Sequence, residues 1–346
     1  MGQTSSCGKC EQIEVKKAEI YPLKTVKCYT SILEGTGPGK INCQDTTCIM
    51  EHIEEECHFF AIYDGFGPSG REASLAANQY IKTCIEVNST KLRMFEDETQ
   101  VEEFFKETFE GAENKMKSLS TYGEDANNSG TCCCCVFIKK NKCYISNLGN
   151  SRVVLCRVTS LGMVQTIDLS ADHKPGLKLE KYRIYKAGGK VRRLVRNGIK
   201  IGTERFWVDK YGPGLTTSRA LGAFRAKSKG LSAEPEIEQI DLFQNDRFLV
   251  IASDGLWDVM KTAEVIEFIL EQEENHLIAE KLVNEAKRRW ELLNVAQGKE
   301  NFMGIGDDPH MNFGYDDISA IVIYLTFFTR EEIEALKSQF RKTVSE

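Results

Sequence analysis

The chain has 346 residues, of which 41% are hydrophobic and 28% are charged, a composition typical of a soluble globular protein with a sizeable core. Its formal net charge is −6 and we identify no basic stripe, which disfavours nucleic acid as a partner. No apolar run reaches the ~18 residues that a membrane-spanning helix needs, and the N-terminus lacks the apolar region of a secretory signal.

The first residues, MGQTSS, match the N-myristoylation pattern with Gly2 as the acceptor. Because one myristoyl chain binds a membrane only marginally, we expect Cys7 or Cys10 to carry a second lipid. The alternative is a disordered tail without a lipid. We therefore predict a flexible tail over residues 1–22 and a location at the cytoplasmic side of a membrane, or in the cytoplasm if no lipid is attached.

The 13 cysteines include a run of four, residues 132–135. Neighbouring residues of a strand point to opposite faces, so this run cannot form a disulfide ladder with itself. We predict that these cysteines are small buried hydrophobes in a reducing compartment. A zinc site is the alternative, because Cys7 and Cys10 form a Cys-x-x-Cys pair, but no second pair with matching spacing follows.

A first strand is predicted over residues 24–33, followed by a glycine-rich loop and the polar cluster KINCQD, residues 40–45. Within this cluster, Lys40 would form either a weak surface ion pair or a contact with an anionic substrate. The aromatic run over residues 58–63 predicts a buried strand that ends where Asp64 and Gly65 turn the backbone.

The sequence GFGPSG, residues 65–70, satisfies the Gly-x-Gly-x-x-Gly pattern of dinucleotide-binding proteins and lies between a predicted strand and a predicted helix. Asp64 would stand where a pyrophosphate approaches, and Pro68 removes an amide donor from the cradle. No run of βαβ units follows. We therefore disfavour a dinucleotide site.

The rest of the chain alternates between amphipathic helical segments and short strands joined by tight turns, which predicts helices and an antiparallel meander. The predicted elements are helices at 71–85 and 101–119 around a polar loop at 88–100, strands at 131–139, 142–147 and 153–158, a short helix within 169–189, strands or loops to 214, a strand at 248–252, helices at 262–272 and 277–293, a long loop at 294–314, a strand at 318–325 and a terminal helix at 330–342.

Three predicted strands carry acids at their ends. Asp64 follows one apolar run, Asp254 follows another, and Asp316 with Asp317 comes directly before a third. A carboxylate at the end of a core strand needs water, donors or a cation to compensate it. The simpler interpretation of each Asp-Gly pair is a turn. Three such acids converging would suit magnesium or manganese rather than zinc.

Several segments together resemble the metal-dependent type-2C serine/threonine protein phosphatases, the PPM family. The matching segments, in the order of the family, are FAIYDGFG (60–67), SGTC (129–132), ISNLGNSRVV (145–154), LSADHKP (169–175), the segment 180–191 ending in KAGGKV, SRALG (218–222), EPEI (234–237), ASDGLWDVM (252–260) and DDISAIV (316–322). The resemblance implies an α+β fold, a four-layer α-β-β-α sandwich of two antiparallel sheets flanked by helix pairs.

The resemblance also implies a site with two Mg or Mn ions that activate a water for direct attack on a phosphoprotein's phosphorus. By position in the motifs, Asp64 bridges both ions, the carbonyl of Gly65 binds one, and Asp254 and Asp316 bind the other. Asp45 is retained in the surrounding shell. Lys40 stands where the family commonly places an arginine on the substrate phosphate, and lysine keeps the charge but loses the bidentate fork.

Four further positions depart from the family pattern. Phe66 replaces a histidine that helps to protonate the leaving group, and Gln44 replaces a frequent acid of the metals' water shell. Asn150 replaces the aspartate of a third, weaker metal position, and Ala223 replaces the aspartate that usually follows SRALG. Because general acid help is typically worth ~10²- to 10⁴-fold, we expect attenuated turnover.

Two functions remain open at this stage. One is metal-dependent hydrolysis of phosphoserine or phosphothreonine in proteins, attenuated or specialised for its substrate. The other is a pseudophosphatase, a module that binds a phosphoprotein or partner without useful chemistry. We expect a monomer with a phosphatase-like domain over residues 23–328, preceded by the tail and followed by a C-terminal helix over 329–346.

Overall fold

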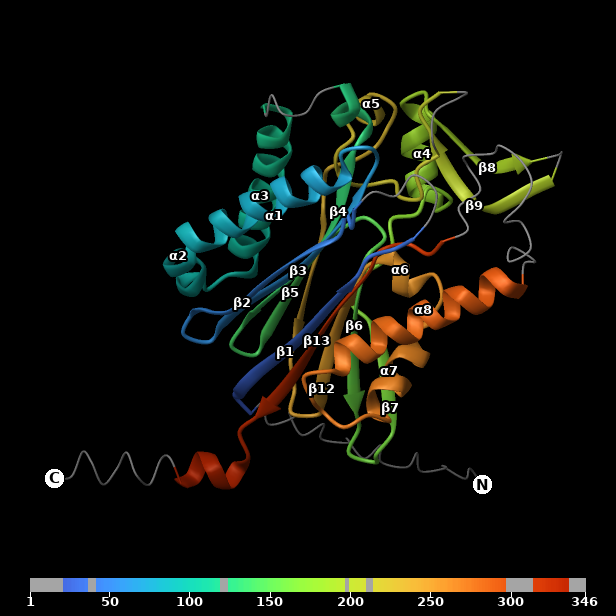
Figure 1. The fold of residues 1–346 in the computed structure, drawn as a ribbon. Helices are drawn as coiled ribbons and strands as arrows, with labels where there is room; N and C mark the ends of the chain where they lie inside the picture. The colour runs from blue at the N-terminus through green and yellow to red at the C-terminus, as the bar shows by residue number, and fades with distance from the viewer. Residues whose placement is uncertain are drawn as a thin grey trace, which may run out of the picture.

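The computed structural model describes residues 21–36, 42–118, 124–196, 199–209, 214–296 and 314–335. Two antiparallel sheets pack face to face, and helices cover both outer faces (Figure 1). The first sheet has the order β1 (Leu23–Leu33), β13 (Ile318–Phe327), β12 (Asp246–Ala252), β6 (Arg152–Val158) and β7 (Val164–Asp168). The second has the order β11 (Glu236–Asp241), β5 (Lys142–Leu148), β4 (Gly130–Lys139), β3 (Cys57–Phe66) and β2 (Thr46–Glu54), with the short β10 (Leu221–Gly222) beside β4. The predicted four-layer sandwich is confirmed.

Alternation along β3 explains why its sequence is apolar throughout. Phe59 and Tyr63 face the helices, whereas Phe60 and Ile62 face the other sheet, and all four are fully buried. A strand that is covered on both faces has no solvent side on which polar residues could alternate. This strand therefore lies between two separate hydrophobic layers.

The cysteine run on β4 follows the same alternation. Cys133 and Cys135 face the helices, Cys134 faces the space between the sheets, and all three are buried free thiols. The cysteines fill the spaces between larger side chains such as Phe59 and Phe60 on the adjacent strand β3. The prediction that residues 132–135 act as small buried hydrophobes is confirmed, because all four are buried.

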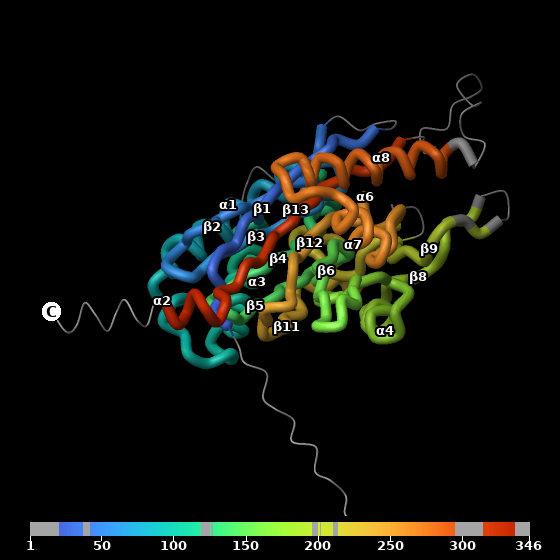
Figure 2. The backbone as a smooth tube through the Cα atoms, turned by 90° about the horizontal axis from the view of Figure 1, so that it is seen from below, coloured from blue at the N-terminus to red at the C-terminus, as the bar shows by residue number. Residues whose placement is uncertain are grey.

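Helices α1 (Gly70–Val87) and α3 (Glu98–Ser118) cover the second sheet, and α7 (Thr262–Leu270) and α8 (Ile278–Ala296) cover the first (Figure 2). The segment predicted as a loop at 88–100 instead contains a helix, α2 (Ser89–Met94). Its residue Leu92 is fully buried in the core between the helices and the second sheet, where α2 contacts β2 and α1. The loop prediction was wrong because one buried leucine stabilises a short helix that polar composition alone does not indicate.

A smaller unit lies beside the sandwich and is called the flap here, residues 178–207. It consists of α4 (Lys178–Lys186) and a hairpin of β8 (Lys190–Arg196) and β9 (Ile199–Trp207), outside both large sheets. Ile184, Val191 and Phe206 form its apolar core together with residues near α5 (Phe224–Lys227). Figures 1 and 2 both place the flap at the end of the molecule away from α2.

Near the C-terminus, residues 330–335 are helical, as predicted, and the remainder of the predicted terminal helix lies outside the described residues. Most of the predicted loop at 294–314 also lies outside them. Among the described residues, no helix is long and apolar enough to cross a membrane.

Candidate active site

The antiparallel register of the second sheet brings two acids together. Thr46 at the start of β2 lies opposite Tyr63 near the end of β3. The residue before Thr46 is Asp45 and the residue after Tyr63 is Asp64, so both carboxylates lie at the same end of the sheet. Asp45 is 3% exposed and Asp64 is half-buried.

The first sheet brings a second set of acids to the same end of the sandwich. Ala252 at the end of β12 lies opposite Ala320 in β13, so the segment after β12 meets the segment before β13. Asp254 begins the short helix α6 (Asp254–Trp257) there, next to Asp316 and Asp317. Asp254 is buried, and its pKa responds to the charge of Asp316.

Burial and mutual repulsion raise the pKa of these carboxyls. Desolvation raises the pKa of Asp64 well above its usual range, and the charges of Asp254, Asp45 and Asp316 add to the shift. Desolvation likewise raises the pKa of Asp254, followed by the charge of Asp316. Desolvation also raises the pKa of Asp45, to about 7. A cation at this end of the sandwich would offset the repulsion between these groups.

The surroundings of Asp45 support the same interpretation. One of its carboxylate oxygens accepts a hydrogen bond from the Ser319 hydroxyl at 2.6 Å, and the other is buried without a partner in the described structure. As the side chains stand, no group of three or more His, Cys, Asp or Glu among the described residues is arranged to hold a metal ion. It is the oxygen donors and their uncompensated charge, rather than a preformed ligand cage, that fit a hard cation.

The acidic pair before β13 divides into two roles. Asp317 is buried, and its two carboxylate oxygens accept hydrogen bonds from the backbone N–H groups of Gly35 at 2.7 Å and Gln44 at 2.8 Å. Asp316 is exposed, and its carboxylate accepts a hydrogen bond from the backbone N–H of Asp317 at 2.8 Å. Asp317 therefore ties two loops to β13, which leaves Asp316 as the acid at the surface of the site.

Glycines at the end of β3 and in the loop that follows it serve close packing. The turn predicted at Asp64 and Gly65 was placed too early, because β3 continues through both residues to Phe66 in its pairing with β4. A Cβ on Gly65 would collide with the carbonyl oxygens of Gly70 and Gln44, so only glycine fits at the end of this strand. Gly67 has a φ of +88°, a conformation that glycine adopts without strain. The strand before this loop belongs to an antiparallel sheet, so the Gly-x-Gly-x-x-Gly match has no βαβ unit around it.

The side chain of Gln44 supports the same loop. Its Nε2 donates to the carbonyl oxygen of Gly67 at 2.8 Å. A carboxylate at this position could not donate that hydrogen bond. Gln44 thus holds the loop that follows Asp64 and contributes no charge to the site.

Asn150 contacts the acid cluster directly. It is buried, and its Nδ2 donates to a carboxylate oxygen of Asp254 at 2.6 Å, while its side-chain oxygen accepts from the Cys132 thiol at 3.1 Å. An aspartate here would face Asp254 with a like charge. The asparagine removes one negative charge from the site and supplies a donor in its place.

Phe66 and Ala223 lie together over Gly130. A Cβ on Gly130 would lie 2.8 Å from Phe66 Cζ and 3.3 Å from Ala223 Cβ. Ala223 is fully buried in the apolar core of the flap, and Phe66 packs against the same cluster. Two departures from the family pattern, 157 residues apart in the sequence, therefore form one apolar wall next to Asp64.

A buried polar network fixes the flap to the sandwich. The carboxylate of Glu180 accepts hydrogen bonds from Arg183 at 2.7 Å, Arg219 at 2.8 Å and the Ser218 hydroxyl at 2.5 Å. Desolvation opposes ionisation of Glu180, but these hydrogen bonds outweigh it and lower the pKa to about 2. The flap is thus held by an ionised, almost fully buried carboxylate.

The same network continues toward the acid cluster through His173. The backbone N–H of Ser218 donates to the carbonyl oxygen of His173 at 2.8 Å, and the N–H of Gly149 donates to His173 Nδ1 at 3.0 Å. Gly149 precedes Asn150, the partner of Asp254. Continuous contacts therefore fix the flap relative to Asp254.

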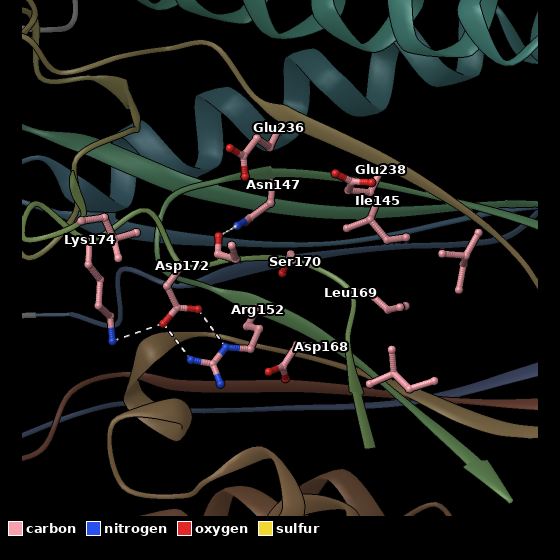
Figure 3. A pocket seen from close by; sticks show the side chains of 14 residues that line it. Ile145, Asn147, Arg152, Asp168, Leu169, Ser170, Asp172, Lys174, Glu236 and Glu238 are labelled. Carbon is pink, nitrogen blue, oxygen red and sulfur yellow. Dashed lines mark hydrogen bonds and ion pairs between the residues drawn. The ribbon is translucent and has the colours of Figure 1, made fainter. Parts of the chain in front are cut away.

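A groove of about 760 Å³ opens beside this network, between the edge strands β7 and β11. At one end of the groove, Asp172 forms an ion pair with Arg152 at 2.8 Å and a second ion pair with Lys174 at 3.2 Å (Figure 3). Lys174 also lies 3.6 Å from Asp258, and its charge opposes the upward shift of the pKa of Asp254. Lys174 thus places a positive charge at the border of the acid cluster.

Several predicted functional residues lie outside the described residues. These are Lys40 and the lipidation candidates Gly2, Cys7 and Cys10. Their predicted roles stay predictions.

Sequence reasoning missed the roles of Asp317, Ser319, Glu180 and His173. The acidic pair gave no sign of which member is buried, because the division depends on loops around residues 35 and 44. Glu180 is the first residue of the segment 180–191 that matches the family. Its position three residues before Arg183 on a predicted helix was the available signal for an ion pair.

Two antiparallel sheets between helix layers, with carboxylates gathered at one end, define a sandwich fold with a candidate hard-cation site. The model of the family described as "Protein phosphatase 2C" matches residues 39–291. The chain belongs to the protein phosphatase 2C family, whose members are metal-dependent.

Related proteins agree with this assignment. The chain is 30% identical over 333 residues to "Probable protein phosphatase 2C 34" of Arabidopsis thaliana, covering 90% of this chain and 86% of that protein. It is 31% identical over 238 residues to the human "Integrin-linked kinase-associated serine/threonine phosphatase 2C", covering 66% of this chain and 56% of that protein.

The fold also resembles solved structures. The serine-threonine phosphatase 2C of Toxoplasma gondii superimposes with a TM-score of 0.66 at 19% identity, covering 89% of this chain and 98% of that chain. A C. elegans sex determining protein gives a TM-score of 0.64 at 18% identity, covering 87% of this chain and 65% of that chain. At these identities the likeness shows the fold alone.

Proposed function

We propose that this protein hydrolyses phosphoserine or phosphothreonine in proteins, with two Mg or Mn ions bound at the acid cluster. The observation that carries the proposal is the gathering of Asp45, Asp64, Asp254 and Asp316 at one end of the sandwich, where burial and repulsion raise the pKa of three of them. A protein that did not bind cations here would gain stability by losing these charges.

In this proposal, the carboxylates of Asp64, Asp254 and Asp316 and the carbonyl of Gly65 would hold the ions. When bound, the ions supply a nucleophilic water at neutral pH and neutralise charge that develops on the phosphoryl group. Asn150 orients Asp254 through its 2.6 Å hydrogen bond, and Asp317 holds the loop that carries Gln44. Lys40 would contact the substrate phosphate.

The proposed activity is attenuated, because the wall formed by Phe66 and Ala223 has no group that transfers a proton. Leaving-group protonation matters most when the leaving alkoxide is a poor one, as with serine. An aryl phosphate needs less help, since a phenolate is a stable leaving group. The protein is therefore expected to favour aryl phosphates over phosphoserine.

The alternative is a pseudophosphatase, a phosphoprotein-binding module on the same fold. The observation that favours it is that Phe66, Ala223 and Asn150 each lack the ionisable group of the family pattern at the site itself. It predicts binding of phosphopeptides without turnover.

Hydrolysis of a phosphopeptide and of an aryl phosphate by the full-length protein, with manganese, tests the proposal. We expect manganese-dependent turnover that Asp254→Ala abolishes. If wild type stays at the background of that variant for both substrates, the binding-module function takes its place. Calorimetry tests the ligands separately, because Asp64→Ala or Asp316→Ala should reduce the heat of manganese binding, and unchanged heats reject the assignment.

We further propose that Gly2 is myristoylated, with Cys7 or Cys10 carrying a second lipid, so that a monomeric protein acts at the cytoplasmic side of a membrane. This proposal is supported by the match of residues 1–6, MGQTSS, to the N-myristoylation pattern. The cellular distribution of Gly2→Ala, compared with wild type, is expected to shift to the soluble fraction. If wild type and Gly2→Ala are both fully soluble, the membrane proposal is rejected and the protein is placed in the cytoplasm.

A further inference from the structure

The flap concentrates positive charge in an otherwise acidic protein. Residues 178–207 contain ten Lys or Arg and two Glu, a net charge of +8, while the whole chain carries −6 and the remainder therefore −14. The expectation of no basic stripe was wrong for this segment. The average over the chain concealed it, because the cations of the flap are outnumbered by acids elsewhere.

The two acids of the flap are already engaged. Glu180 is buried under Arg183 and Arg219, and Glu204 accepts a hydrogen bond from Lys181 at 2.7 Å. Five exposed flap cations have no ion-pair partner among the described residues. They are Lys178, Lys186, Lys190, Arg193 and Lys200.

Apolar and aromatic side chains lie between these cations. Leu179 is 80% exposed and Tyr182 is 66% exposed on α4, and Val195 on β8 is 51% exposed. The β8–β9 hairpin pairs with neither large sheet. This combination of cations with exposed apolar groups is typical of a surface that binds a partner with acidic side chains.

The position of the flap connects this surface to the reacting centre. Its apolar core contacts Phe66, two residues after Asp64, and the network through Glu180, Ser218 and His173 fixes it to the loop that carries Asn150. A chain lying across the flap would therefore be held at a constant position relative to the acid cluster.

We infer that the flap is a docking surface for an acidic segment flanking the phosphorylated residue of the substrate protein, which rests on the proposed function. The surface recognises carboxylates through the five exposed cations and adjacent apolar side chains through α4. Docking strengthens binding of the substrate without taking part in the chemical step. It thus selects phosphoproteins with acidic flanks.

The test compares two phosphopeptides with the same phosphoserine core, one with acidic and one with neutral flanks, by fluorescence anisotropy with the full-length protein. Wild type should bind the acidic peptide roughly tenfold more tightly at low salt, an advantage that falls as salt rises. The variant Lys186→Glu/Lys190→Glu/Lys200→Glu should lose this advantage. The matched control Lys82→Glu/Lys91→Glu/Lys140→Glu, with the same charge change on exposed residues away from the flap, should keep it.

The corresponding Lys→Gln triple variant on the flap, which adds no negative charge, guards against a folding defect and should lose most of the advantage. Equal binding of both peptides to wild type overturns the inference, as does an advantage that survives both flap variants. If the flap lysines instead govern binding to phosphatidylserine vesicles or to a single-stranded oligonucleotide, without distinguishing the peptides, the surface belongs to that partner and the inference fails.

Hydrolysis of an aryl phosphate separates this inference from the proposed function. The small substrate does not reach the flap, so flap variants should leave its manganese-dependent rate unchanged. Discrimination between the peptides without any such hydrolysis would reject the phosphatase and retain the docking surface. Hydrolysis of the aryl phosphate without discrimination between the peptides would retain the phosphatase and reject the docking surface.

Discussion

The two sides of the candidate site differ in what they retain. On the sandwich side, Asp64 and Asp254 come from strand ends in different sheets and meet as carboxylates with raised pKa values. On the flap side, Phe66 and Ala223 form an apolar wall. The comparison separates two tasks of a phosphatase, because binding cations and donating a proton to the leaving group depend on different surfaces.

The largest expected effect comes from breaking the sandwich side. Asp254→Ala should lower manganese-dependent hydrolysis of an aryl phosphate by about 10³-fold or more, since stabilisation of transition-state charge by a metal ion is worth several kcal/mol. Asp241→Ala, a change of an exposed acid on β11, should have little effect and serves as the control. Equal rates for wild type and Asp254→Ala would contradict the importance of the acid cluster.

Removing the connection between the two sides should reduce stability. The pKa of Glu180 is about 2 in the folded protein against an ordinary value of 4.5, so its ionisation stabilises the fold by about 3 kcal/mol above pH 4.5. This contribution is lost as the pH falls from 4.5 toward 2, because the unfolded chain binds the proton first. Glu180→Gln should remove it and flatten the pH dependence in urea unfolding experiments.

Glu204→Gln is the matched control for that prediction. Its partner Lys181 is at the surface of the same flap, where an ion pair contributes less than about 1 kcal/mol. Equal losses of stability in both variants would show that the buried network has no special role.

Restoring a proton donor on the flap side sharpens the comparison. Phe66→His should raise the phosphoserine rate by about 10²-fold, the low end for acid catalysis, because Ala223 offers the new imidazole no polar partner. The aryl phosphate rate should barely change. Phe66→Leu keeps an apolar side chain and should leave both rates near wild type, and a similar gain in that variant would rule out proton transfer as the cause.

The smallest effect is expected at the point where the two sides meet. Asn150→Asp replaces a donor to Asp254 with a like charge and should lower the free energy of unfolding by about 2 kcal/mol without metal. Manganese should recover most of this loss in a thermal unfolding experiment, since the added carboxylate would then face a cation. Asn150→Ala loses the donor without adding charge, so its deficit should not respond to manganese.

Local sequence patterns gave much of the fold correctly. The aromatic run before Asp64 predicted the buried strand β3, and the helical spacing over residues 101–119 predicted α3. By contrast, α2 was missed, because its stability comes from the burial of Leu92 in the core formed by distant segments of the chain. The charge of the flap was also missed, since only its separation from the sandwich makes it a distinct surface.

The sequence by itself determined that acids stand at strand ends and that Phe66, Asn150 and Ala223 depart from the family pattern. It did so because strand ends and ordered motifs are local properties that can be read along the chain. The tertiary structure alone decided which acids share a site, that Asp317 is a buried tie to two loops, and that Phe66 contacts the same glycine as Ala223. These contacts join segments far apart in the sequence, and their existence depends on how the two sheets and the flap pack.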